Sequence, residues 1–149
     1  MDTPQKRRRT RPSEPYVLEE QVGFILRQVS QRHAMIFTGR MSDDLTPTQF
    51  SALVKLHAEG AVSQNLLGRL TAMDTATIKG VIDRLAARGY VEARPDQDDS
   101  RLRILALTAL GTAAVERALP LAAAITEDTL APLGVRERAT LLVLLRRLV

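Results

Sequence analysis

Residues 73–90 have the sequence MDTATIKGVIDRLAARGY, in which apolar residues recur at helical spacing. At about 100° per residue, the aliphatic residues Ile78, Val81, Ile82 and Leu85 lie on one narrow stripe of a helix. Asp74 precedes this stripe and is typical of an N-cap residue, and a glycine follows the stretch Ala86-Ala87-Arg88 as a C-cap residue would. The stretch therefore predicts a short amphipathic helix with one buried face.

Gly80 lies nearly opposite this buried stripe. A glycine inside a helix costs about 1 kcal/mol relative to alanine. The residues around it on the outer face are small or hydroxylated, with one lysine: Thr75, Ala76, Thr77 and Lys79. A low surface of this kind suits the major groove of DNA, where the N-terminal turns of a helix meet base edges. The alternatives are a solvated glycine without a function and close packing against another helix.

The segments on either side complete a recognisable motif. Residues 63–73 (SQNLLGRLTAM) predict a second short helix, which Ser63 caps and whose leucines face the core. Downstream, YVEAR (90–94) and LRILALT (102–108) alternate in polarity, and the turn-forming residues PDQDDS lie between them. Two short helices followed by a β-hairpin form a winged helix-turn-helix.

This motif defines the candidate DNA-binding residues. Arginines on a wing contact phosphates or enter the minor groove, although ordinary strand-surface charge explains any single one equally well. The candidates are Ser63, Gln64, Thr75, Thr77, Lys79, Gly80, Arg94, Arg101 and Arg103.

Helices are also predicted on both sides of the motif, at 17–41, 46–60, 108–133 and 135–149. Thr46 begins a capping box with Gln49, and Pro120 is expected to kink the long helix that contains it. The first helix is apolar on two sides and the last has a wide apolar face, so a second subunit is expected to cover both. The predicted fold class is mainly α with a small β-hairpin wing.

These patterns divide the chain into an arm and one domain. Residues 1–15 are expected to form a flexible basic arm, and residues 16–149 a single domain. Within this domain, 16–42 and 109–149 are the predicted dimerisation helices, and 46–108 is the predicted winged helix-turn-helix. The net charge of the chain is +4, and all of that excess lies in residues 1–11. Arg7, Arg8 and Arg9 are candidate phosphate contacts. A nuclear-localisation patch or a solubilising tail explains the same charge.

Composition excludes several classes of function. The chain has no cysteine, which removes disulfides, thiolate metal sites and thiol redox sensing. No G-x-S-x-G, P-loop or GxGxxG motif is present, and the two histidines lie on different predicted helices. We therefore expect no catalytic residues, no metal and no cofactor. No apolar run approaches a membrane span and no signal peptide follows the basic start, so a soluble, cytoplasmic protein is expected.

Three segments resemble the MarR family of transcriptional regulators: LTPTQFSALVKL (45–56), VIDRLAARGYVEARPD (81–96) and DSRLRILALTALG (99–111). The resemblance implies a homodimeric repressor that reads a palindromic operator in double-stranded DNA. It also implies that Asp99 pairs with an arginine to shape the wing and that Arg101 reaches toward the minor groove. The wing tip departs from the family pattern, because DQDDS is acidic where basic residues are usual.

The resemblance further implies a small anionic or aromatic effector between the dimer helices and the DNA-binding part. The candidate effector residues are Arg32, His33, Ile36, Phe37 and Phe50, although aromatic residues at this spacing are more often core. The segment GFILRQVSQRHAMIF (23–37) resembles family members that serve aromatic-acid catabolism, including repressors relieved by hydroxycinnamoyl-CoA thioesters. An aromatic acid or its CoA thioester is therefore expected. The alternative function is a winged-helix module for architectural DNA binding or protein contact, without an effector.

Overall fold

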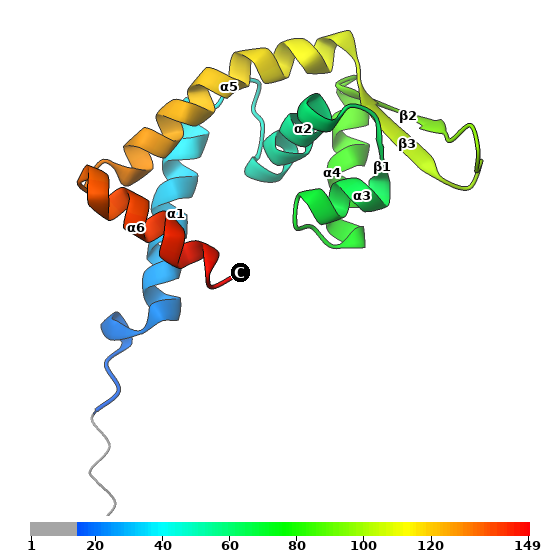
Figure 1. Cartoon of the computed structure of the whole chain (residues 1–149). Helices are drawn as coiled ribbons and strands as arrows, with labels where there is room; N and C mark the ends of the chain where they lie inside the picture. The colour runs from blue at the N-terminus through cyan, green and yellow to red at the C-terminus, as the bar shows by residue number, and fades with distance from the viewer. Residues whose placement is uncertain (1–14) are drawn as a thin grey trace, which may run out of the picture.

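The computed structural model describes residues 15–149 and shows a mainly helical chain with one small sheet (Figure 1). In chain order the elements are the 3-10 turn η1 (Leu18–Glu20), α1 (Val22–Arg40), α2 (Pro47–Glu59), β1 (Val62–Ser63), α3 (Gln64–Leu70), α4 (Thr75–Ala87), β2 (Val91–Pro95), β3 (Arg103–Leu107), α5 (Ala109–Leu130) and α6 (Val135–Arg146). Helices α2, α3 and α4 gather with the sheet, and we call this part the winged lobe. The long helix α5 contacts α2 in this lobe and α1 outside it.

The short helices begin where their local sequence predicts, although α3 ends at Leu70 and not at residue 73. At the start of α2, the Thr46 hydroxyl accepts a hydrogen bond from the Gln49 backbone N–H, and the Gln49 side chain accepts one from the Thr46 backbone. Ser63 caps α3 and Asp74 caps α4 in the same way, each accepting from a backbone N–H three residues on. The structure confirms these predicted caps.

The core lies between α4, its neighbouring helices and the sheet. The four stripe residues of α4 are at most 3% exposed and pack in one cluster with buried side chains of α2, α3, β3 and α5. The buried partners include Leu53, Leu67, Leu105 and Val115. Burying apolar side chains of this size stabilises a fold by about 1.5–3 kcal/mol each, so this cluster holds α4 in a fixed orientation.

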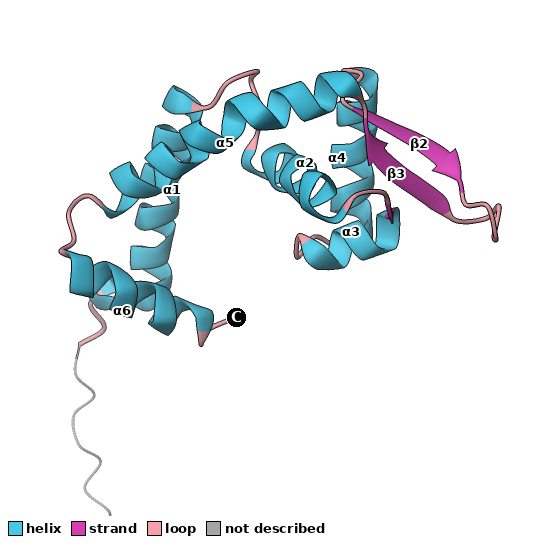
Figure 2. Cartoon of the chain, turned by 45° about the horizontal axis from the view of Figure 1, so that its top comes forward, coloured by secondary structure: helices cyan, strands magenta, loops and turns pink. Residues whose placement is uncertain are grey.

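The wing is an antiparallel hairpin in which Val91 pairs with Leu107 and Pro95 pairs with Arg103. It extends away from the helices (Figure 2). The strand β1, which the sequence analysis missed, pairs with the other edge of β3 and makes a three-stranded sheet in the order β1-β3-β2. Its two residues are too few to show an alternating pattern. This strand connects the start of α3 directly to the wing.

The predicted first helix is wrong at its N-terminal end. Residues 18–20 form a 3-10 turn, and Gln21 is extended, with φ of −84° and ψ of 133°, so α1 begins only at Val22. The Gln21 side-chain amide donates to the Val17 carbonyl at 2.8 Å, which stabilises this local turn instead of a helix. Pro120 lies inside α5, which continues through it and arches along its length (Figure 1).

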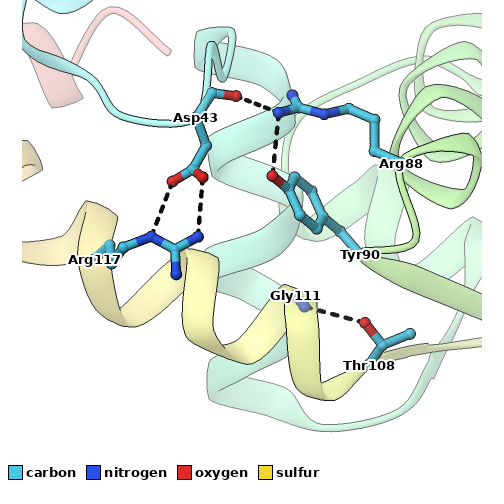
Figure 3. A network of polar contacts seen from close by, with 6 residues as sticks. All are labelled: Asp43, Arg88, Tyr90, Thr108, Gly111 and Arg117. Carbon is cyan, nitrogen blue, oxygen red and sulfur yellow. Dashed lines mark hydrogen bonds and ion pairs between the residues drawn. The ribbon is translucent and has the colours of Figure 1, made fainter.

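A polar network joins the loop between α1 and α2 to α5 and to the short segment that connects α4 with β2 (Figure 3). Arg117 on α5 binds both carboxylate oxygens of Asp43, with N···O distances of 2.9 and 3.3 Å. Arg88 donates to the Asp43 carbonyl and lies over the Tyr90 ring at 4.7 Å from its centroid. The Arg117 hydrogen bond holds the pKa of Asp43 below its usual value, so the carboxylate stays ionised at neutral pH.

Large apolar side chains remain exposed on both terminal helices. They are Val22, Ile25, Leu26, Val29 and Met35 on α1, and Val135, Leu142, Val143, Leu144 and Leu145 on α6. A single chain therefore leaves uncovered the surfaces for which the sequence predicts a second subunit. Within residues 15–149, no helix is both long and apolar enough to cross a bilayer.

Candidate nucleic-acid interface and effector site

The outer face of α4 is open. Thr75, Thr77 and Lys79 are exposed there. A Cβ atom added to Gly80 would meet only a guanidinium nitrogen of Arg84, at 3.8 Å, beyond the local helix backbone. The predicted orientation of this face is confirmed, because no other element of the described chain covers it. Close packing of Gly80 against another helix of the described chain is wrong, whereas contact with DNA and a solvated glycine without a function both stay predictions.

The start of α3 and the part of the wing where β3 begins line one surface. Ser63, Gln64, Arg101 and Arg103 line a single pocket together with Asn65 and Leu102. The pairing of β1 with β3 produces this proximity, since it places Ser63 opposite Ile104. The structure thus brings together candidate residues that lie almost 40 positions apart in the sequence.

At the wing tip, Arg101 is held by Asp99. The Arg101 guanidinium donates to both carboxylate oxygens at 3.0 and 3.1 Å, and its backbone N–H donates to the same carboxylate. These hydrogen bonds lower the pKa of Asp99. The resemblance implied that Asp99 pairs with an arginine, and in the structure that arginine is Arg101. To reach DNA, the Arg101 side chain would have to give up one or both of its hydrogen bonds to Asp99.

Arg94 on β2 pairs with Ile104, the residue next to Arg103, but it does not share a pocket with the other two wing arginines. It lines a different pocket, beside Asp96 and Asp98 of the acidic tip. Arg7, Arg8 and Arg9 fall outside the residues that the structure describes.

Sequence reasoning missed several polar residues beside the candidate interface. Asn65 and Arg69 of α3 line a pocket with Thr75 at the start of α4. On the outer face of α4, Asp83 accepts a hydrogen bond from the Lys79 ammonium at 2.7 Å. The signal for this pair was available in the sequence, because residues four positions apart are neighbours on a helix.

The candidate effector residues gather where α1 meets α2 and the end of α5. Arg32 donates to the carbonyls of Thr129 and Asp128 at 2.6 and 2.9 Å, and His33 Nδ1 lies 2.8 Å from the Thr129 hydroxyl. A guanidinium at these final carbonyls also complements the negative end of the α5 dipole. In this structure Arg32 and His33 therefore hold α1 against α5.

The aromatic candidates continue this contact into the winged lobe. The Phe37 ring lies 6.4 Å from the His33 ring and 6.1 Å from the Phe50 ring, in an edge-to-face arrangement with the latter. Phe37 is 5% exposed, so it is a core residue, whereas Ile36 and Phe50 are half-buried. This row of rings links α1 to α2.

Comparison with known proteins agrees with this architecture. Residues 43–102 match the sequence profile of the MarR family. The chain is 41% identical over 136 residues to the HTH-type transcriptional repressor NicR of Pseudomonas putida, covering 91% of this chain and 86% of NicR.

Two solved structures are also similar. A probable transcriptional regulator from Pseudomonas aeruginosa is 48% identical, with a TM-score of 0.87 and coverage of 89% of this chain and 100% of that one. Bordetella bronchiseptica BpsR, whose DNA binding is regulated by 6-hydroxynicotinic acid, is 40% identical, with a TM-score of 0.87 and coverage of 91% and 97%. The chain therefore belongs to the MarR family of winged helix-turn-helix transcriptional regulators, and it is a DNA-binding regulator and not an enzyme.

Proposed function

We propose that this regulator is a homodimeric repressor that binds an inverted-repeat operator and is released by a small aromatic acid. The observation that carries the proposal is the open outer face of α4, with Lys79 exposed and Gly80 half-exposed on a helix whose opposite face is fixed in the core. The similarity to a repressor and to a protein whose DNA binding responds to 6-hydroxynicotinic acid supports it.

The dimer would form through the terminal helices, residues 16–42 and 109–149. Their exposed apolar side chains need a partner surface, and a twofold axis covers the same patch on both subunits at once. Two copies of the winged segment, residues 46–108, would then face one side of the duplex. A palindromic site matches that symmetry.

On DNA, each α4 would enter the major groove through Thr75, Thr77, Lys79 and Gly80. Ser63 and Gln64 at the start of α3 would contact the backbone, and Arg94, Arg101 and Arg103 would place the wing against phosphates or the minor groove. Residues 1–15 would form a basic arm in which Arg7, Arg8 and Arg9 add phosphate contacts.

The effector would bind where α1 meets α5 and α2. The Arg32 guanidinium suits a carboxylate, since this pairing gives two parallel hydrogen bonds, and His33 suits a ring hydroxyl. Ile36, Phe37 and Phe50 would contact the aromatic ring. A carboxylate on Arg32 would replace the carbonyls of Asp128 and Thr129, so the ligand would favour a different arrangement of α1 and α5. Only such a difference in affinity between two arrangements moves a regulator off DNA.

Footprinting across the DNA flanking the coding gene tests the proposal. We expect protection of one inverted repeat, and loss of that protection when 6-hydroxynicotinic acid or a related hydroxylated aromatic acid is added. Release by a CoA thioester alone would assign the larger ligand class instead. Arg32→Gln should bind the operator but resist release, whereas Arg27→Gln, which removes an arginine that stacks on Phe24 of the same helix, should respond normally.

The alternative functions predict other footprints. Diffuse protection without an inverted repeat would contradict the repressor and indicate an architectural DNA-binding protein. No protection on any duplex would indicate a protein-contact module. Protection of an inverted repeat that no aromatic acid or thioester relieves would contradict the proposed effector but not the proposed operator binding.

A further inference from the structure

One carboxylate lies on the face that the proposed function directs toward DNA. Asp83 follows Lys79 by one helical turn, and its Oδ2 atom accepts a hydrogen bond from the Lys79 ammonium at 2.7 Å. Both side chains are about half exposed, at 60% for Lys79 and 48% for Asp83. Gly80 follows Lys79 without a side chain, and a Cβ atom built there would meet only a guanidinium nitrogen of Arg84, so this part of the α4 surface is low.

Helix stability does not explain an aspartate at this position. Aspartate is a weaker helix former than most residues, and a negative charge in the C-terminal half of a helix opposes the helix dipole. The order of the pair, with lysine before the acid, is the less favourable order for residues four apart. Exposed pairs of this kind also contribute little to folding.

The electrostatics link the pair to the wing. The Lys79 hydrogen bond lowers the pKa of Asp83 most, and the positive charges of Lys79 and of Arg103 on β3 lower it further. The negative charge of Asp83 therefore acts on two of the cations proposed to contact DNA, and most strongly on Lys79. A free lysine ammonium would bind any phosphate, whereas one donor of this ammonium is already engaged.

We propose that Asp83 determines specificity by positioning Lys79. The carboxylate directs the ammonium toward a base edge in the major groove and reduces its contribution to phosphate binding on unrelated DNA. Lysine binds the O6 and N7 atoms of guanine through its remaining donors, so a G·C pair is the expected target. Specificity commonly arises from weaker binding to competing partners, which here are DNA sites of unrelated sequence. This inference rests on the proposed placement of α4 against DNA.

The test measures Asp83→Asn on two duplexes of equal length, one carrying the footprinted inverted repeat and one carrying its scrambled sequence. We expect affinity for the scrambled duplex to rise about threefold per subunit, or about tenfold for the dimer, without a gain on the operator. The salt dependence on scrambled DNA should steepen by about two, one additional phosphate per subunit. Replacing one G·C pair in each half-site should reduce operator affinity less in Asp83→Asn than in the unchanged chain.

Two further variants separate the explanations. In a Lys79→Met background, Asp83→Asn should change none of these quantities, because Asp83 acts through the lysine. Asp98→Asn, a matched removal of a wing-tip carboxylate, should leave the G·C preference intact. If Asp83→Asn raises the affinity for both duplexes equally, and does so in the Lys79→Met background as well, the inference is wrong. Asp83 would then act only by general repulsion of DNA. If Lys79→Met alone leaves binding to both duplexes unchanged, the placement of α4 itself is wrong, and the proposed function fails with it.

Discussion

Gly80→Glu is expected to abolish operator binding while leaving a folded dimer. The position is half-exposed and a side chain there would meet only Arg84, so glutamate fits the free protein without a clash. On DNA, the same side chain would fill the narrow space between α4 and the groove and place a carboxylate against the duplex. We expect the operator affinity of the dimer to fall by about a hundredfold or more, measured by fluorescence anisotropy.

Gly80→Ala is the matched control for this experiment. A methyl group is small enough for a close helix-to-groove contact, and alanine stabilises a helix by about 1 kcal/mol relative to glycine. This variant should retain operator binding and melt at an equal or higher temperature. Operator affinity for Gly80→Glu equal to that of the unchanged chain would contradict the account.

Gly111→Ala is expected to destabilise the chain by about 3 kcal/mol, near the upper end of overpacking effects. Gly111 lies in the first turn of α5, where its N–H donates to the Thr108 hydroxyl at 3.1 Å (Figure 3). A Cβ atom there would overlap the Tyr90 carbonyl oxygen and lie 2.9 Å from the Tyr90 carbonyl carbon. Backbone atoms cannot turn aside as a flexible side chain does, so α5 would have to move away from the wing.

Thermal unfolding checks this prediction, with an expected fall in Tm of about 10 °C. Gly39→Ala is the control, since Gly39 also lies in a helix and a Cβ atom there would meet no atom within 4 Å beyond its chain neighbours and the local helix backbone. That variant should be unchanged or slightly more stable. A Gly111→Ala chain as stable as the unchanged one would mean that the close approach of α5 to Tyr90 is absent in solution.

Features that depend on neighbours in sequence were predictable. Successive residues of the apolar stripe of α4 are at most three positions apart, each cap at Thr46, Ser63 and Asp74 joins residues three positions apart, and all are present in the structure. The hairpin strands were found for the same reason, since alternation and a turn are local signals.

Features that depend on distant contacts were not predictable. The two-residue β1 forms because the chain entering α3 lies against β3, more than 40 residues later. The left-handed backbone of Asp43, with φ of 57°, is held by Arg88 and Arg117, which no local pattern indicates. Likewise, the contact of Arg32 with the end of α5 joins residues 96 or 97 positions apart. The sequence therefore indicated Arg32 as a candidate residue, but it did not indicate the carbonyls that Arg32 contacts.

Because the chain has no cysteine, a single introduced cysteine can show whether a symmetric pair of chains presents α4 to DNA. A single cysteine introduced as Thr77→Cys can carry an iron chelate that cleaves DNA near the outer face of α4. We predict two clusters of cuts in the operator, related by its twofold axis and facing the major groove. The same chelate at Ala123→Cys, on the exposed side of α5, should not produce them. Cuts in one cluster only, or no cuts from position 77, would contradict a symmetric pair of chains that presents α4 to DNA.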